Sequence, residues 1–174
     1  MTNLRRWLML SAMLLSLVAA TAASAALAAQ ERVVVLTGAE LARIVPPGFY
    51  FEGQSAPTQM RNSAAARLGA KRHVVAGIVD TSGYSADVRA KYEGFFITDS
   101  PIQIEGSPLE PGAYGFGFTD DSKLNIFDVG GRQVLSVNTT SDRVLRRPRP
   151  LMMSLTRNEL RLYSGRSYAV IAAR

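Results

Sequence analysis

The sequence contains no cysteine and a single histidine among its 174 residues. Without cysteine, the chain can form no disulfide, no thiolate metal site, no thiol nucleophile and no lipoprotein-type lipid attachment. One histidine, His73, excludes metal sites built from several histidines, and no Gly-x-Ser-x-Gly motif provides a nucleophile for it. The sequence also lacks a glycine-rich loop of the kind that holds phosphates. We therefore expect no metal and no cofactor.

Residues 1–28 have the order of a secretory signal peptide. Arg5 and Arg6 form a basic head, residues 8–20 are apolar and uncharged, and small residues in Ala-x-Ala patterns follow at residues 23–28. The apolar run has about 13 residues, fewer than the roughly 20 that span a bilayer, although the alanines after it leave an uncleaved anchor as the alternative. We expect cleavage, a periplasmic or secreted protein over residues 29–174, and membrane contact only through the signal segment.

Charge is distributed unevenly along the chain, which has a formal net charge of +6. Residues 142–174 contain eight arginines and two acidic residues, a net charge of +6, whereas residues 26–141 contain ten basic and twelve acidic residues, a net charge of −2. A basic region of this kind either meets an acidic partner or simply remains solvated. The candidate partner-binding residues are Arg146, Arg147 and Arg149. Nucleic acid is not expected as a partner, because an exported chain without a nucleic-acid motif gives no reason for it.

Short strand-like segments separated by turn residues fill most of residues 29–174. Residues 113–119, 124–129 and 133–138, joined by turns at 120–122 and 130–131, predict a three-stranded meander. The other expected strands are residues 32–36, 49–51, 73–79, 95–98, 102–105, 151–156, 160–163 and 167–172. We expect one all-β domain, an antiparallel β-sandwich or a small β-barrel, with one or two short helices.

Three segments receive specific structural expectations. Thr37 and Glu40 have the spacing of a capping box, which predicts a helix of about two turns before Pro46. Residues 54–58 are rich in serine, proline and threonine and predict a loop. Residues 88–92 alternate between apolar and polar and predict a strand, with a short helix capped by Ser85 as the alternative.

Two aspartates suggest one enzymatic alternative. The segment around Asp80 (IVDTSG) is similar to the active-site loop of aspartic proteases, and the segment around Asp128 (IFDVG) is a looser version. In that family two carboxylates share one proton and activate water. Ser82 and Val129 depart from the family pattern, and aspartates at strand ends commonly accept hydrogen bonds from turn backbone instead.

Two further groups are candidate ligand-binding residues. Tyr114, Phe116 and Phe118 share one face of a strand with glycines on the other face, which indicates either a ligand wall or a tightly packed core. A polar stretch after residues 49–51 provides the second group, either a binding loop or a solvated surface loop. Its members are Glu52, Gln54, Arg61 and Asn62.

Residues 101–106 (PIQIEG) with residues 109–114 (LEPGAY) resemble a pattern in uncharacterised secreted bacterial β-sandwich domains. The resemblance implies a sandwich fold and export, and it carries no functional residues. We expect a non-catalytic binding module of the bacterial cell envelope, for a small apolar ligand or an envelope component. The alternatives are an exported hydrolase using Asp80 and Asp128, and a structural or assembly partner that docks through its arginine-rich C-terminal third. The sequence gives no indication of the oligomeric state.

Overall fold

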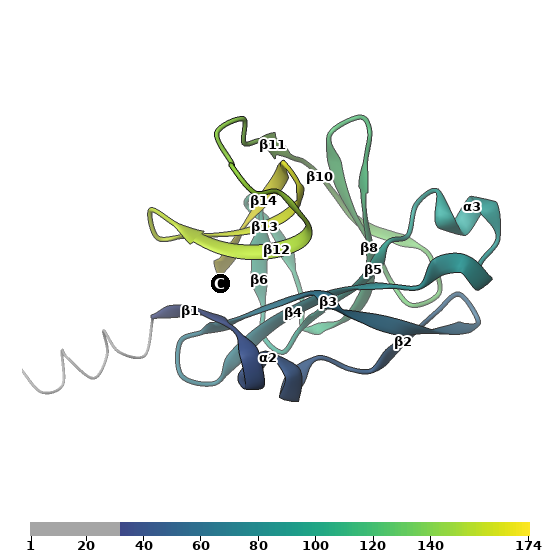
Figure 1. Cartoon of the computed structure of the whole chain (residues 1–174), viewed down its shortest axis with the longest axis horizontal. Helices are drawn as coiled ribbons and strands as arrows, with labels where there is room; N and C mark the ends of the chain where they lie inside the picture. The colour runs from purple at the N-terminus through teal and green to yellow at the C-terminus, as the bar shows by residue number, and fades with distance from the viewer. Residues whose placement is uncertain (1–31) are drawn as a thin grey trace, which may run out of the picture. The chain divides into compact units, whose positions relative to one another are not determined.

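The computed structural model describes residues 32–174, and the expected signal peptide at residues 1–28 lies outside the described residues. A compact unit spans Val33–Arg174. It consists of two antiparallel sheets with short helices, and no barrel closes (Figure 1). The all-β prediction is confirmed, and of its two forms the sandwich is the one observed.

The first sheet has eight strands in the order β1-β3-β4-β5-β8-β9-β10, with β2 paired to β3 outside this path. Its strands are β1 (Val33–Leu36), β2 (Gly48–Phe51), β3 (Gln54–Leu68), β4 (Arg72–Val79), β5 (Gly94–Thr98), β8 (Gly112–Thr119), β9 (Lys123–Phe127) and β10 (Gln133–Asn138). Because β8, β9 and β10 are neighbours in both the chain and the sheet, the predicted meander is confirmed.

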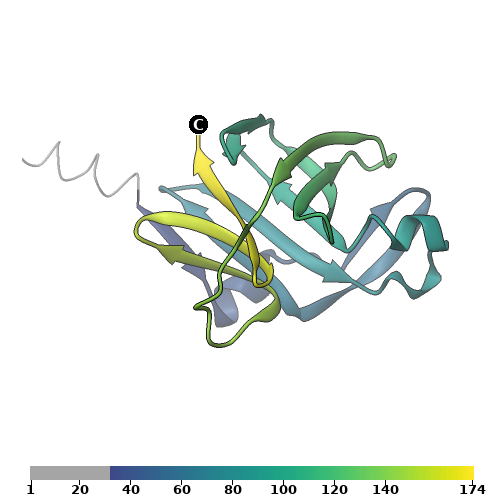
Figure 2. The ribbon, with the colours of Figure 1, turned by 90° about the horizontal axis from the view of Figure 1, so that it is seen from above.

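The second sheet has six strands in the order β12-β13-β14-β6-β7, with β11 paired to β14. Its strands are β6 (Ile102–Ile104), β7 (Ser107–Leu109), β11 (Thr140–Ser141), β12 (Arg149–Thr156), β13 (Glu159–Gly165) and β14 (Ser167–Ala173). Arg157 and Asn158 join β12 to β13 with positive φ angles of 51° and 66°, as a two-residue hairpin turn requires. Figures 1 and 2 show β12–β14 lying across the first sheet.

The main core lies between the two sheets. Alternate residues of a strand point to opposite faces, so Phe116, Ile126 and Leu162, each 0 % exposed, meet in this layer. Burial of each such side chain contributes about 1.5–3 kcal/mol to folding. This hydrophobic layer holds the second sheet in place and leaves that sheet's outer face to solvent and loops.

A second core covers the outer face of the first sheet. Helix α2 (Gly38–Ile44), strand β2, the 3₁₀ turn η1 (Thr81–Gly83) and helix α3 (Ala86–Arg89) surround it. The rings of Phe51 and Tyr92 stack there with centroids 4.0 Å apart. The first sheet is therefore buried on both faces over much of its area.

Two local predictions are wrong. The expected loop at residues 54–58 is the start of β3, because its backbone pairs with β2 from Gln54 to Pro57. This two-stranded ribbon lies outside the main path of the sheet, where polar side chains can face solvent. The expected strand at residues 88–92 is instead a helical turn, and the alternative capped by Ser85 is correct, with Ser85 Oγ accepting from Val88 N at 3.4 Å. Val88 and Tyr92 are both buried and four residues apart, the spacing of one helical face.

Helix α2 forms as expected, but without the expected cap. The side chain of Thr37 makes no capping hydrogen bond. Apolar residues of α2, Leu41 and Ile44, instead pack against the second core. This short helix is therefore stabilised by tertiary packing and not by the predicted capping hydrogen bond.

Candidate functional site

Asp80 and Asp128 each accept hydrogen bonds within their own turn. Asp80 Oδ1 accepts from Ser82 N at 3.0 Å. Asp128 Oδ1 accepts from the backbone of Gly130 and Arg132, and its Oδ2 pairs with the Arg132 guanidinium at 3.0 Å. These bonds, led by those from the backbone of Ser82 and Arg132, hold the pKa of both carboxyls below the usual value. A proton-sharing pair would have one raised pKa, so their geometry is that of turn-capping carboxylates.

The backbone contacts of these turns also place them apart. Asp80 N donates to Pro57 O at 3.0 Å, whereas Val129 O, beside Asp128, accepts from Glu52 N at 2.9 Å. Those two anchors lie at opposite ends of the ribbon formed by β2 and the start of β3, roughly 10 Å apart at 3.3 Å per strand residue. Each carboxylate is therefore engaged within its own turn, and no hydrogen bond joins Asp80 to Asp128 within residues 32–174.

Of the three aromatic residues of β8, Phe116 is buried in the main core, and Tyr114 and Phe118 are half-buried and pack against it. Phe116 is 0 % exposed in the main core, and Phe118 meets it edge to face with ring centroids 6.1 Å apart. The bare face behind them is filled as well. A Cβ atom on Gly115 would lie 2.5 Å from the Phe51 ring, and one on Gly117 would lie 2.1 Å from Lys91 O. Of the two interpretations of this strand, the arrangement has the features of a tight core.

The polar candidates after β2 are spread along one strand instead of converging. Glu52, at the β2–β3 turn, pairs with Lys91 Nζ at 2.6 Å, and Gln54 accepts through its carbonyl from Tyr84. Asn62 donates to Gln59 at 2.8 Å. Arg61 stands seven residues beyond Gln54, roughly 20 Å away along an extended strand. These side chains do not form one site.

The arginine-rich C-terminal third, in contrast, contains an ordered loop, defined here as residues 142–149, which joins β11 to β12 and includes the first residue of β12. Asp142 Oδ1 accepts from the backbone N–H groups of Val144 and Leu145, each at 3.1 Å. Arg166 donates to Leu145 O at 2.6 Å and to the carbonyls of Asp142 and Arg143 at 3.3 Å. The loop is therefore held at its start by one carboxylate and one guanidinium.

This loop covers the outer face of the second sheet. Leu160 and Leu162 point into the main core, so Arg161 and Tyr163 of β13 point outward. Tyr163 is nevertheless only 2 % exposed, and its hydroxyl donates to Asp142 Oδ2 at 3.1 Å. Burial raises the pKa of Tyr163, which keeps this hydroxyl a donor.

A second contact on this face is a stacked cation. The guanidinium of Arg161 lies 4.4 Å from the ring centroid of Tyr168 on β14, an arrangement that attracts a cation to the aromatic face. Glu159 accepts from Arg161 Nη2 at 2.6 Å and from Nε at 3.2 Å. These bonds raise the pKa of Arg161 and compensate its charge.

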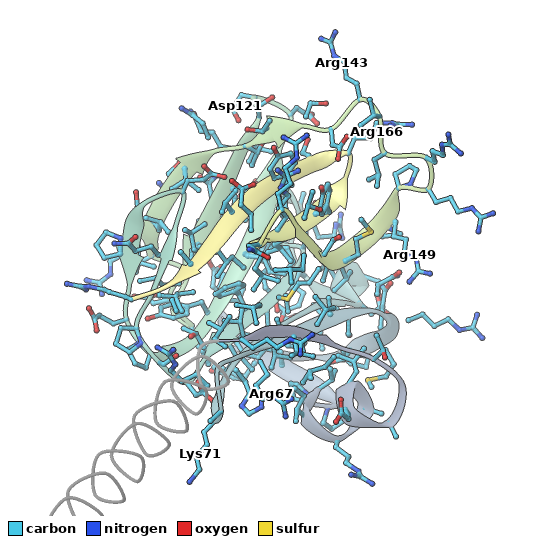
Figure 3. The ribbon with its side chains drawn as sticks, turned by 90° about the vertical axis from the view of Figure 1, so that its left-hand side faces the viewer. Arg67, Lys71, Asp121, Arg143, Arg149 and Arg166 are labelled. Carbon is cyan, nitrogen blue, oxygen red and sulfur yellow. The ribbon has the colours of Figure 1, made fainter. Side chains whose placement is uncertain are left out.

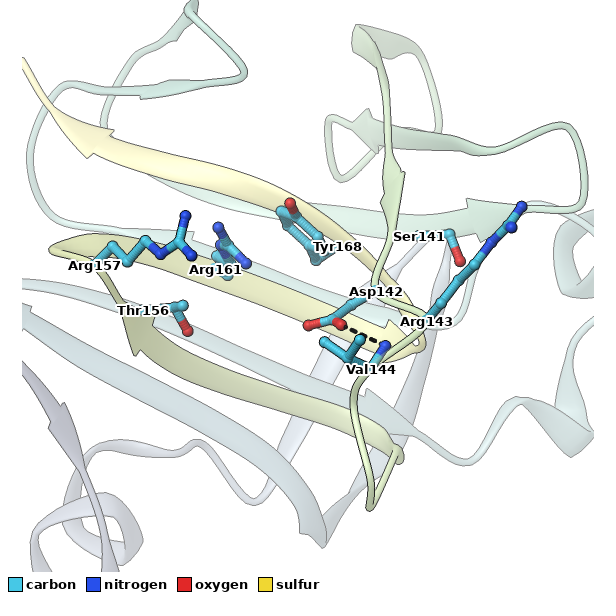
Figure 4. Close-up of a pocket in the computed structure, with 8 residues that line it drawn as sticks. All are labelled: Ser141, Asp142, Arg143, Val144, Thr156, Arg157, Arg161 and Tyr168. Atoms are coloured by element: carbon cyan, nitrogen blue, oxygen red, sulfur yellow. Dashed lines mark hydrogen bonds between the residues drawn. The ribbon is translucent and has the colours of Figure 1, made fainter.

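A shallow pocket of about 380 Å³ opens between the loop and this face. Figure 4 shows its lining residues, with Arg157 and Arg161 on the same side as the Tyr168 ring and Arg143 beyond Asp142. The lining residues are Ser141, Asp142, Arg143, Val144, Thr156, Arg157, Arg161 and Tyr168. Both carboxylate oxygens of Asp142 already accept hydrogen bonds, and the other polar side chains of the lining carry hydroxyl or guanidinium groups.

Most arginines around the pocket have no acidic partner. Within residues 32–174, no carboxylate lies within 4 Å of a side-chain nitrogen of Arg143, Arg146, Arg147, Arg149 or Arg157, and all five residues are exposed. Figure 3 shows Arg143 and Arg149 extending outward on either side of Arg166 in this view, with Arg67 and Lys71 at the other end. The predicted candidates Arg146, Arg147 and Arg149 are exposed and follow the pocket residues Arg143 and Val144 closely in the chain.

Sequence reasoning missed Tyr168 and the role of Asp142. The alternation of Arg161 and Tyr163 between two core leucines was available in the sequence. It places these side chains on the outer face, where Tyr168 lies directly opposite Tyr163 in the ladder. The loop that closes over them is a long-range contact, so no local pattern indicates it.

Other chemical features add little to this surface. Residues 32–174 contain no group of three potential metal-ligating His, Cys, Asp or Glu side chains. No helix in that range is long and apolar enough to cross a membrane.

No family model, no curated protein sequence and no solved structure matches the chain.

Proposed function

We propose that the protein is a non-catalytic binding module of the bacterial cell envelope that holds an acidic envelope component. The binding surface is the arginine-rich C-terminal third, centred on the loop at residues 142–149 and the adjoining pocket. One observation carries the proposal. Two exposed arginines without an acidic partner, Arg143 and Arg157, line the pocket, and three more, Arg146, Arg147 and Arg149, follow Arg143 in the adjoining chain segment, while Asp142 and Glu159 already accept hydrogen bonds. Guanidinium groups in such a setting favour carboxylates or phosphates, which they bind through paired N–H donors.

The charge balance around the pocket supports this proposal. Glu159 forms an ion pair with Arg161, and Asp142 accepts hydrogen bonds from the loop backbone and from the Tyr163 hydroxyl. Arg166 is held by carbonyl groups, which leave its positive charge uncompensated. The field at this end of the sandwich is therefore positive and attracts acidic groups before contact.

The same geometry supports binding over catalysis at this site. A general base needs a free lone pair directed at the substrate proton. Among the described residues, Asp142 is the only carboxylate lining the pocket, and its three hydrogen bonds, two at Oδ1 and one at Oδ2, commit it to holding the loop and Tyr163. The lining arginines are hydrogen-bond donors that orient an acidic ligand.

The test is a neutralising variant with a matched control. Arg146→Gln, Arg147→Gln and Arg149→Gln together remove three charges from the surface. The control, Arg43→Gln, Arg61→Gln and Lys71→Gln, removes three exposed charges elsewhere that have no partner within the described residues. Binding of polyglutamate and of inorganic polyphosphate is measured by titration. At about 1 kcal/mol for each exposed charge pair, the first variant should lose roughly 100-fold in affinity.

Two results would contradict the proposal. One is an absence of binding to both polyanions at low ionic strength. The other is an equal loss in the control variant, since net charge alone would then account for binding. Circular dichroism should be unchanged in both variants, because all six side chains lie outside the two cores.

A further inference from the structure

Val144 is exposed to an unusual degree. Its residue surface is 87 % accessible, whereas the other exposed large apolar residues lie between 41 % and 56 %. The exposure is built in, because Asp142 Oδ1 binds the N–H groups of Val144 and Leu145 and Arg166 binds the Leu145 carbonyl. The loop therefore presents one apolar side chain to solvent from an ordered backbone.

Arginines lie on both sides of this apolar tip. Arg143 precedes Val144, and Arg146, Arg147 and Arg149 follow it, all exposed and without an acidic partner among the described residues. A soluble polyanion can form ion pairs with the arginines but makes no apolar contact with Val144. A bilayer of anionic lipid satisfies both, since phosphates meet the guanidinium groups and the boundary between headgroups and acyl chains receives the apolar side chain.

We infer that the acidic component is the surface of an anionic lipid bilayer, approached by the loop at residues 142–149 with Val144 inserted among the headgroups. This inference rests on the proposed function and specifies its partner. The contact is distinct from any membrane contact of the N-terminal segment, because it uses only the C-terminal third. A single inserted valine gives a weak, reversible attachment whose strength depends on the arginines around it.

The first experiment is vesicle sedimentation with the full-length chain. The vesicles are phosphatidylcholine, with or without phosphatidylglycerol. The variants are Val144→Ser and the triple replacement of Arg146, Arg147 and Arg149 by glutamine, with the triple control used above. Every variant keeps the same N-terminal segment, so differences between them report on the loop. We expect binding that requires phosphatidylglycerol and weakens with ionic strength, a loss of about tenfold for Val144→Ser, and a larger loss for the arginine variant.

The second experiment locates the inserted residue. The chain has a single tryptophan, Trp7, so Val144→Trp in a Trp7→Phe background provides one fluorophore at the loop tip. Its emission should shift to shorter wavelength when phosphatidylglycerol vesicles are added. Val134→Trp in the same background is the control on β10, 41 % exposed in the parent residue, and should not shift.

The outcomes separate the two levels of the proposal. If wild-type protein binds polyphosphate and polyglutamate but the triple arginine variant binds vesicles as well as wild type, the lipid inference is overturned and the proposed function stands. Equal binding of Val144→Ser and wild type to anionic vesicles also overturns it, as does an unshifted emission from the Val144→Trp variant. If wild-type protein binds neither polyanion at low ionic strength, the proposed function fails, and the lipid inference that rests on it fails with it.

Discussion

Gly117 in β8 provides the sharpest test of how the first sheet meets α3. An ideal Cβ at this position would lie 2.1 Å from Lys91 O and 2.9 Å from Lys91 C. Both are backbone atoms, so no side-chain rotation relieves the overlap. The segment around Lys91 is in turn held by the bond from its N–H to Val88 O at 3.1 Å and by the pair with Glu52. Gly117→Ala must therefore separate two backbones by about an ångström.

The cost of that separation follows from known overpacking effects. Adding a methyl group to a tightly packed site costs about 1–3 kcal/mol, and a rigid backbone contact belongs at the upper end. At roughly 2–4 °C per kcal/mol for a domain of this size, a loss near 3 kcal/mol lowers Tm by about 6–12 °C. Urea unfolding followed by circular dichroism, together with a thermal scan, measures both quantities.

Gly83→Ala is the matched control. A Cβ there would lie 3.7 Å from the Gln54 side chain, an ordinary contact, and the residue does not need a positive φ. The alanine should be neutral or stabilise by about 0.4–1 kcal/mol through the unfolded chain. If Gly117→Ala costs no more than Gly83→Ala, the close approach between β8 and the end of α3 is not present in solution and the reasoning is refuted.

Three further results are expected. Burial raises the pKa of Glu93, so the free energy of unfolding should fall as the pH rises from the pKa of the unfolded state through that of the folded state. In Glu93→Gln this fall should be smaller when the free energy of unfolding is measured from about pH 4 to pH 8. An unchanged pH profile in the variant would contradict this. Phe116→Ala should cost about 3–5 kcal/mol in urea unfolding, because its ring fills the main core, and a loss under about 1 kcal/mol would argue against that packing. Asp142→Ala removes the acceptor for the N–H groups of Val144 and Leu145 and should speed hydrogen exchange at both amides, while equal protection in the variant would show that Arg166 alone holds the loop.

The strand content, the meander at β8–β10 and the helix near residue 40 could be predicted from the sequence. Each of these depends on periodicity and turn chemistry within a few residues, such as the glycine pair at residues 130–131. The same local reasoning erred at residues 54–58 and 88–92. In the first, pairing with β2 overrides a loop-like composition; in the second, Val88 and Tyr92 satisfy both strand alternation and helical spacing, and packing against the second core selects the helix.

The sequence by itself determined the chemistry available to this protein: no thiols, one histidine, and an arginine excess in the last third. Those properties are sums over residue types and do not depend on folding. Only the tertiary structure decided which charged groups remain free. Asp142 reaches Tyr163 and Arg166 through contacts 21 and 24 residues apart, and such long-range pairings leave no local pattern. These contacts hold the Asp142 carboxylate and the start of the loop in place, and they leave Val144 exposed beside the arginines.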